Sequence, residues 1–209
     1  MNISFYFDPC CPFCWVTSRW LLMVSGDRNI NISWCPFSLA IKNDELLGKN
    51  NSHGSDAHRS AHRVLRVMMA AQKQGAKLID LYTDFGIANH IAGQEFNDEL
   101  IRDVLDKHKL SPDLLKAADD KSYDESLKDS IASATEIVGQ DIGVPTIVFE
   151  LKDGTKAGYF GPVLQDLPDK EESLKLWDAL SELATSKSFY ELKRNRPQGG
   201  PDVYSTAKC

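Results

Sequence analysis

The chain has 209 residues, of which 42% are hydrophobic and 26% charged, a composition typical of globular proteins. Its net charge of -6 argues against a nucleic-acid partner, because phosphate binding depends on clustered lysine and arginine side chains. No apolar run of about eighteen residues occurs, so no membrane span is expected, and the N-terminus lacks the features of a secretion signal. We therefore expect a cytoplasmic protein without a membrane partner.

The first predicted elements are a strand, a helix and a second strand. Residues 3–7, ISFYF, are short, aromatic and β-branched, which is typical of a buried strand. Apolar residues then recur at helical spacing from Pro12 until Gly26, and proline is favourable at a helix start because its missing N–H would be unpaired there. A second strand is predicted over residues 30–39, where Cys35 lies on the opposite phase and is interpreted as structural.

Residues 42–139 are predicted to form about five helices, separated by Gly, Asn or Ser-Pro signals. Strand character returns in GVPTIVFEL and TKAGYFGPV, joined by a KDG turn, before a last helix over residues 170–185 and a polar tail. This order predicts an α/β protein with a thioredoxin-like fold and an inserted all-helical subdomain. The thioredoxin-like domain would be discontinuous, comprising residues 1–41 and 140–209, with residues 42–139 as the insertion.

The cysteines indicate metal or redox chemistry. Five cysteines in a long chain of this type do not form the disulfide framework of a small secreted domain. A structural zinc site needs four ligands, and no second close cysteine pair accompanies Cys11 and Cys14. His58 and His62 have i, i+4 spacing, but HRSAH lacks the glutamate of a metalloprotease helix. We expect a solvated helix face there, and no metal site.

The junction between the first strand and helix favours a redox dithiol. A thiolate at a helix N-terminus faces unpaired backbone N–H groups and the positive end of the helix dipole, which stabilise it. Cys11 is therefore predicted to be the nucleophile, and Cys14, one turn later and more buried, to resolve a mixed disulfide. Asp8 and Pro9, which precede the motif, would shape the approach to Cys11. The alternative is a pair of buried structural thiols.

The segment GVPT becomes informative beside such a dithiol. A proline that opens a strand is usually trans and without a role. Thioredoxin-like folds instead place a cis-proline next to the C-x-x-C motif, and Val144-Pro145 at the start of a strand fits that arrangement. The backbone of Val144 would then offer hydrogen bonds to an extended or thiol-tripeptide-like substrate.

Seven segments together resemble the DsbA-like, mycothiol-dependent nitroreductases of actinobacteria over nearly the whole chain. They are FDPCCPFCWVTSRWL, SLAIKN, GAKLIDLYTDFG, GVPTI, YFGPVL, KLWDAL and FYELKR. The C-P-x-C motif points only to the larger DsbA group, whereas WVTSRWL and FYELKR are more specific.

The resemblance implies a cytosolic oxidoreductase with no bound cofactor, whose dithiol is reduced by mycothiol as a co-substrate. Its substrates would be mixed or protein disulfides and nitroaromatic compounds, and a mycoredoxin-type protein is a further expected reductant. The catalytic cysteines are carried over to Cys11 and Cys14, the cis-proline to Pro145, and an active-site asparagine to Asn43. The expected substrate-binding set consists of Pro12, Phe13, Asn43, Val144 and Pro145. A monomer or a homodimer is expected.

Three features depart from the family pattern. Phe13 stands where a tryptophan is usual, which keeps a flat ring but loses the indole N–H. Residues 44–60 contain no tyrosine where the family has one near the pocket. Cys10 is extra, and a disulfide to the neighbouring Cys11 would be strained. Thiol exchange is therefore a firmer expectation than nitroreduction.

Three other functions remain open from the sequence. A disulfide isomerase or folding catalyst of the broader DsbA group would rescue scrambled proteins with little need for mycothiol. A non-redox interaction module would use C-x-x-C as a zinc half-site in a dimer. An isomerase related to glutathione transferases commonly has serine at the nucleophile position, so the presence of both Cys11 and Cys14 weighs against it.

Overall fold

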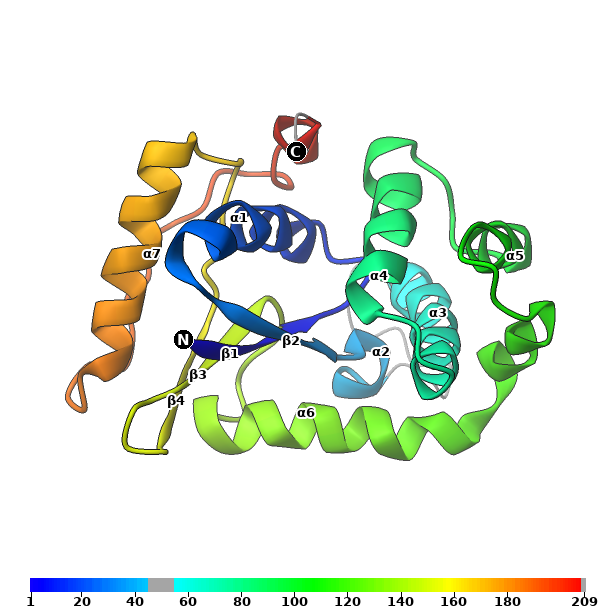
Figure 1. Ribbon diagram of the computed structural model, residues 1–209, viewed down its shortest axis with the longest axis horizontal. Coiled ribbons are helices and arrows are strands. Elements are labelled where there is room, and N and C mark those ends of the chain that lie inside the picture. The colour runs from blue at the N-terminus through cyan, green and yellow to red at the C-terminus, as the bar shows by residue number, and fades with distance from the viewer. Residues whose placement is uncertain (45–54, 208–209) are drawn as a thin grey trace. The chain divides into compact units, whose positions relative to one another are not determined.

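The structure, a computed structural model, describes residues 1–44 and 55–207 (Figure 1). The chain divides into two compact units, each assembled from separate stretches of sequence. The first unit consists of Met1–Phe7, Cys11–Cys35 and Ser133–Cys209, and the second of Asp8–Cys10 and Pro36–Ala132. Among the described helices, none combines the length and apolar character needed to cross a bilayer.

The first strand and helix form as predicted, with one difference in length. β1 spans Asn2–Phe7 and α1 spans Pro12–Arg28, with Pro12 at the helix start. The helix runs past Gly26, where a stop was expected, and ends at Asn29, whose left-handed backbone (φ 49°) caps it. A glycine inside a helix costs only about 1 kcal/mol relative to alanine. α1 is buried along residues 14–21 and again at Val24. This packing outweighs the cost of Gly26, so the helix continues.

β2 spans Asn31–Pro36 and is shorter than the predicted strand. The prediction extended it to residue 39, but Ser38 begins a new element: its side chain accepts a hydrogen bond from the N–H of Ile41 and caps α2, a short helix over Leu39–Lys42. A serine that caps a helix in this way competes with strand continuation.

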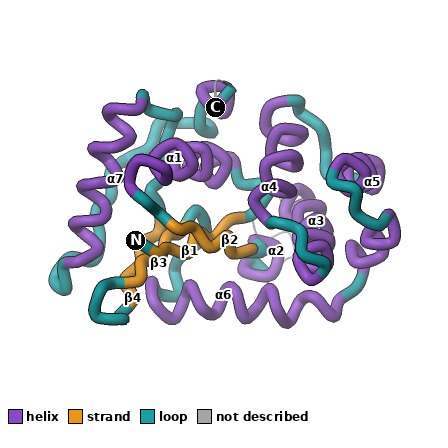
Figure 2. The backbone as a smooth tube through the Cα atoms, viewed as in Figure 1, coloured by secondary structure: helices purple, strands orange, loops and turns teal. Residues whose placement is uncertain are grey.

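The predicted hairpin follows the helical segment. β3 (Thr146–Glu150) pairs antiparallel with β1 and with β4 (Lys156–Phe160), and the sheet order is β2-β1-β3-β4 (Figure 2). Gly158 is required in β4, since a Cβ there would lie 2.7 Å from a methyl carbon of Val138. The β-α-β start followed by a hairpin is the pattern that the sequence predicted.

The core of the first unit is aromatic. α7 spans Lys170–Thr185, the residues predicted, and it packs against α1 and β4 (Figure 1). Trp177 of α7 lies 6.0 Å from Trp20 of α1 and 5.8 Å from Phe149 of β3, measured between ring centroids. The indole N–H of Trp20 donates to the carbonyl of Ser173, so its one polar atom is satisfied.

The second unit is helical. The sequence predicted about five helices here, and helices form throughout the described part of this segment. The helix that follows the Ser111-Pro112 signal is a 3-10 helix, and a π-helix extends α4. The elements are α3 (Ser55–Lys73), α4 (Leu78–Gly86), η1 (Ile87–Ile91), α5 (Asp98–Lys107), η2 (Pro112–Asp119), η3 (Lys121–Tyr123) and the first part of α6 (Asp124–Val138). Large fully buried side chains from α3, α4 and α5 fill the core of this unit: Leu65, Met68, Leu81, Tyr82, Phe85 and Ile101.

The C-terminal tail, which the sequence predicted only to be polar, contains a packed segment. It ends in a 3-10 helix, η4, over Val203–Thr206. Thr206 is buried, and its hydroxyl accepts a 2.9 Å hydrogen bond from the indole N–H of Trp15 in α1. The tail therefore packs against the helix that carries the dithiol.

Candidate active site

Cys11 occupies the N-cap position of α1, where strand and helix meet. Its Sγ accepts a hydrogen bond from the backbone N–H of Cys14 at 3.3 Å and lies 3.5 Å from the carbonyl oxygen of Val144. The thiol is 8% exposed, whereas Cys14 is fully buried. An N–H donor stabilises a thiolate, and a thiol can donate to the carbonyl, so the position supports both forms of the sulfur.

The other predicted residues of the first unit lie around this sulfur. The Val144–Pro145 bond is cis, as expected, and the Pro145 carbonyl accepts a 2.7 Å hydrogen bond from the N–H of Gly161. A second cis bond, Gly161–Pro162, follows, and the Pro162 carbonyl accepts from the Thr17 hydroxyl of α1 at 2.8 Å. This second cis-proline was not predicted, because its only local signal was the dipeptide Gly-Pro.

Pro12 and Phe13 form the first turn of α1. The guanidinium carbon of Arg196 lies 5.2 Å from the centroid of the Phe13 ring, within the range of a cation–π contact. Arg196 was not predicted as a site residue, because nothing in a polar tail indicates which basic residue will reach a ring almost two hundred positions earlier.

Asn43 belongs to the second unit, and its role stays a prediction. It forms the C-cap of α2, and its backbone N–H donates to the Leu39 carbonyl at 2.9 Å. The start of α2 is held by Ser38, whose hydroxyl lies 2.9 Å from Nδ1 of His62. The backbone that precedes Asn43 is thus tied to buried polar groups.

The predicted solvated face at His58 and His62 is wrong for His62. That residue is 1% exposed, and its Nε2 lies 3.0 Å from a carboxylate oxygen of Asp124. Arg66 binds the same carboxylate through two hydrogen bonds of 2.7 Å. Histidine one turn before arginine on α3 therefore forms part of a buried polar network.

The turn that precedes the dithiol is held by residues of the second unit. Asp8 is fully buried and accepts hydrogen bonds from the N–H groups of Cys10 (3.0 Å) and Leu39 (2.8 Å). Nε2 of His90, in the π-helix η1, lies 2.9 Å from the Pro9 carbonyl oxygen. His90 was not among the predicted site residues, although π-helical turns often occur at functional sites.

Burial lowers the pKa of His90 to about 4, against a smaller opposite effect of its hydrogen bond to the Pro9 carbonyl. The imidazole is therefore neutral at pH 7, and we assign Nε2–H as the donor to that carbonyl. His62 has its pKa lowered to about 4 as well, by burial and by the charge of Arg66.

We expect the free energy of unfolding to fall as the pH is lowered from about 6.5 to about 4. The unfolded chain takes up protons on these histidines near pH 6.5, whereas the folded chain does so only near pH 4, so the stabilisation is complete above the unfolded value and lost below it. Guanidinium unfolding of wild type and His90→Gln at several pH values checks this. An equal pH dependence in the two proteins would contradict the assignment to His90.

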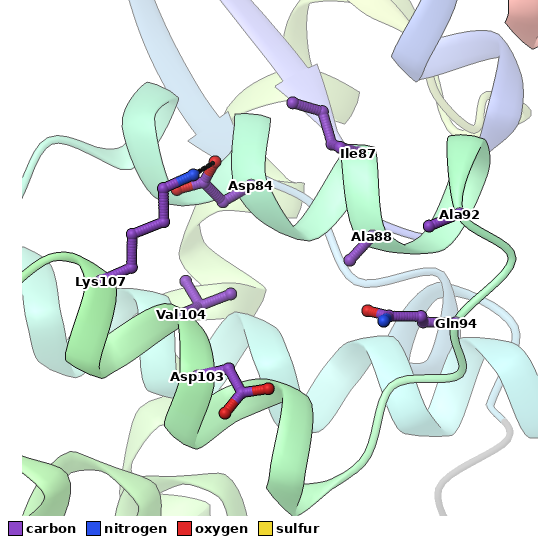
Figure 3. A pocket seen from close by; sticks show the side chains of 8 residues that line it. All are labelled: Asp84, Ile87, Ala88, Ala92, Gln94, Asp103, Val104 and Lys107. Carbon is purple, nitrogen blue, oxygen red and sulfur yellow. Dashed lines mark hydrogen bonds and ion pairs between the residues drawn. The ribbon is translucent and has the colours of Figure 1, made fainter.

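The structure also contains a hollow of about 270 Å³ in the second unit, between α4, η1 and α5 (Figure 3). It is lined by Asp84, Ile87, Ala88, Ala92, Gln94, Asp103, Val104 and Lys107. No predicted site residue lines it.

A dithiol at the start of a helix and a cis-proline before the adjoining strand are features of thioredoxin-fold oxidoreductases. Structural similarity agrees with the thioredoxin fold. DsbM, a cytosolic disulfide reductase from Pseudomonas aeruginosa, matches with a TM-score of 0.60 and 12% identity, covering 88% of this chain and all of that chain. A probable DsbA oxidoreductase, SCO1869 from Streptomyces coelicolor, matches with a TM-score of 0.56 and 14% identity, covering 96% of this chain and 98% of that one.

Sequence comparison identifies the family. Residues 10–194 match the family model described as Rv2466c-like, mycothiol-dependent nitroreductase Rv2466c. An uncharacterized protein of Mycobacterium tuberculosis, Rv2286c, is 30% identical over 206 residues, which cover 97% of this chain and 84% of the relative. The chain belongs to the Rv2466c-like mycothiol-dependent nitroreductase family, and it is a thiol–disulfide oxidoreductase of that type.

Proposed function

We propose that the protein is a cytoplasmic enzyme that reduces mixed and protein disulfides through Cys11 and Cys14, with mycothiol as the electron donor. The observation that carries the proposal is the position of Cys11 Sγ, between the N–H of Cys14 and the carbonyl of Val144. The family match supports mycothiol, a low-molecular-weight thiol, as the co-substrate. The similar DsbM protein is described as cytosolic and has been solved with glutathione, which supports the class of small thiol and the compartment.

The proposed reaction has two halves. The Cys11 thiolate attacks one sulfur of a substrate disulfide, so that a mixed disulfide forms and the other sulfur leaves as a thiolate. Cys14, after losing its proton, attacks Cys11 Sγ and releases the second product thiol, leaving a Cys11–Cys14 disulfide. One mycothiol thiolate then attacks Cys11 Sγ, which forms a mixed disulfide with Cys11 and releases Cys14 as a thiolate. A second mycothiol thiolate attacks the mycothiol sulfur of that mixed disulfide, so that Cys11 leaves as a thiolate, the dithiol is regenerated and mycothiol disulfide is the product.

The substrate-binding residues are proposed on the same basis. Pro12 and Phe13 follow Cys11 in the first turn of α1, and the peptide bond between Val144 and Pro145 leads into β3. The Val144 backbone would pair with an extended substrate, Phe13 would contact aromatic rings, and Asn43 would bind polar groups. Nitroaromatic compounds are proposed as further substrates because the family is named for that reduction.

We also propose the domain limits expected from the sequence, with residues 1–41 and 140–209 as the thioredoxin-like domain and residues 42–139 as the helical insertion. A monomer or a homodimer is compatible with this arrangement, and a mycoredoxin-type protein is a proposed second reductant.

Phe13→Ala is expected to raise KM for a nitroaromatic substrate by about 2- to 12-fold, the equivalent of the roughly 0.5–1.5 kcal/mol that an aromatic pair contributes. KM for a small aliphatic disulfide should change little, because no ring contact is lost. Steady-state kinetics with both substrates test this. Phe160→Ala, at an exposed phenylalanine of β4, is the control. An equal rise in KM for both substrates would contradict a ring-binding role of Phe13.

The function is tested by incubating the enzyme with a mixed disulfide of mycothiol and a reporter thiol, and measuring reporter release with mycothiol or glutathione present. Turnover that depends on mycothiol supports the proposal. Rescue of scrambled ribonuclease without mycothiol would favour the DsbA-group isomerase instead. A zinc content of half an equivalent per chain or more, together with no turnover, would favour the interaction module.

A further inference from the structure

The third thiol of the motif has a defined environment that the proposed reaction does not use. Cys10 Sγ lies 3.1 Å from Oδ1 of Asp8, and the same oxygen accepts the Cys10 backbone N–H at 3.0 Å. The other carboxylate oxygen accepts the N–H of Leu39 at 2.8 Å. Each oxygen of Asp8 thus receives at least one hydrogen bond, the arrangement suited to an ionised carboxyl group.

We propose that the buried carboxylate of Asp8 holds Cys10 in its protonated form and thereby acts as a specificity-determining residue that confines disulfide exchange to Cys11 and Cys14. The consequence for exchange rests on the proposed function, whereas the state of Cys10 does not.

The physical reason is repulsion between like charges. A thiolate at Cys10 would lie 3.1 Å from a carboxylate oxygen of Asp8. Asp8 is 0% exposed, so water screens the repulsion between the two negative charges poorly. The protonated thiol of Cys10 instead donates a hydrogen bond to that oxygen. One proton is therefore shared by the pair, and it belongs on sulfur because a carboxyl is ordinarily the far stronger acid.

The other groups that act on Asp8 do not change this conclusion. Burial is the largest effect and holds the pKa of Asp8 above its ordinary value, while the hydrogen bonds from Leu39 and Cys10 and the charge of His58 act in the opposite direction and favour the ionised form. The hydrogen bonds from Leu39 and Cys10 stabilise the ionised carboxylate of Asp8. They would be lost or weakened if Asp8 took up the proton of Cys10.

The protection matters because of where Cys10 lies. It precedes Cys11 directly in the chain, so a Cys10 thiolate would be a second nucleophile next to any mixed disulfide on Cys11. Only the thiolate attacks a disulfide, and a protonated thiol does not. With Cys10 protonated, Cys14 is left to resolve the mixed disulfide.

The test measures Cys10 alone, in a Cys11→Ser/Cys14→Ser protein that has no redox activity. Iodoacetamide labelling of the Cys10 peptide is followed by mass spectrometry across a pH series, with and without Asp8→Asn. Asparagine keeps an acceptor oxygen and removes the charge. We expect the labelling rate of Cys10 at about pH 8.5 to rise by roughly tenfold or more in the Asp8→Asn protein. An unchanged rate would overturn the proposal.

A second comparison decides the matter if Asp8→Asn does not fold. In the protein that retains Asp8, the labelling rate of Cys10 should keep rising at pH values where a simple cysteine peptide has reached its plateau. The shape of this profile does not depend on how accessible the sulfur is, since access changes only the overall rate. A profile that matches the free peptide would overturn the proposal, and neither result bears on whether Cys11 and Cys14 form a redox pair.

Discussion

Cys11→Ser is expected to reduce disulfide turnover by at least about a thousandfold, because the hydroxyl that replaces the sulfur is not ionised near neutral pH and is a poor nucleophile toward disulfides. We expect the Cys11→Ser variant to fold normally, so the loss of turnover reports the missing thiolate and not a disrupted helix. A serine at this position accepts the N–H of Cys14 as well as the sulfur does, since serine is a preferred N-cap residue. The measurement is the initial rate of mycothiol-dependent disulfide reduction.

Cys35→Ser is the matched control. Cys35 is a half-buried thiol of β2, burial raises its pKa, and nothing in the proposed reaction uses it. Its variant should keep the wild-type rate. If Cys11→Ser turned over at the wild-type rate, the assignment of the nucleophile would be wrong.

Cys14→Ser is expected to stop the reaction after its first half. Cys11 still attacks the substrate disulfide, but the variant has no second thiol on α1 to resolve the mixed disulfide. Cys14 is fully buried and lies three positions after Cys11. It is the one cysteine of the described residues of α1, so no other thiol of that helix can replace it. The adduct should accumulate close to one per chain.

Intact-protein mass spectrometry under non-reducing conditions measures this adduct, and peptide mapping assigns it to Cys11. Wild type treated in the same way should show only a loss of two hydrogens, from the internal disulfide. An adduct on Cys10 in the variant would contradict the proposal that Asp8 keeps Cys10 protonated. The absence of any adduct would contradict the attack by Cys11 on the substrate disulfide.

The sequence predicted the local features of this protein well. The dithiol could be placed because Pro12 and the apolar residues after it define a helix start, and the hairpin because KDG separates two strands. The cis bond at Val144–Pro145 could be expected only in combination with Cys11 and Cys14. The first two predictions depend on residues that are close together in the chain. The third depends on the known association of a cis-proline with the C-x-x-C motif.

The contacts between distant segments could not be predicted. The burial of Thr206 against Trp15, the contact of Arg196 with Phe13 and the hydrogen bond of His90 to Pro9 each join residues that are at least eighty positions apart. Polar residues with no periodicity give no signal of such partners. For the same reason His62 was expected in solvent, although it lies in a buried network with Asp124.

The central claim is that Cys11 and Cys14 form a redox pair that mycothiol reduces. Stopped-flow tryptophan fluorescence of the oxidised protein tests it most directly, because Trp15 follows Cys14 in α1 and is expected to report the state of the disulfide. Mycothiol, glutathione and dithiothreitol are mixed with the protein in turn. The account predicts a fast, stoichiometric change with mycothiol and a slower one with glutathione. Reduction by dithiothreitol alone, with mycothiol no faster than glutathione, would contradict it.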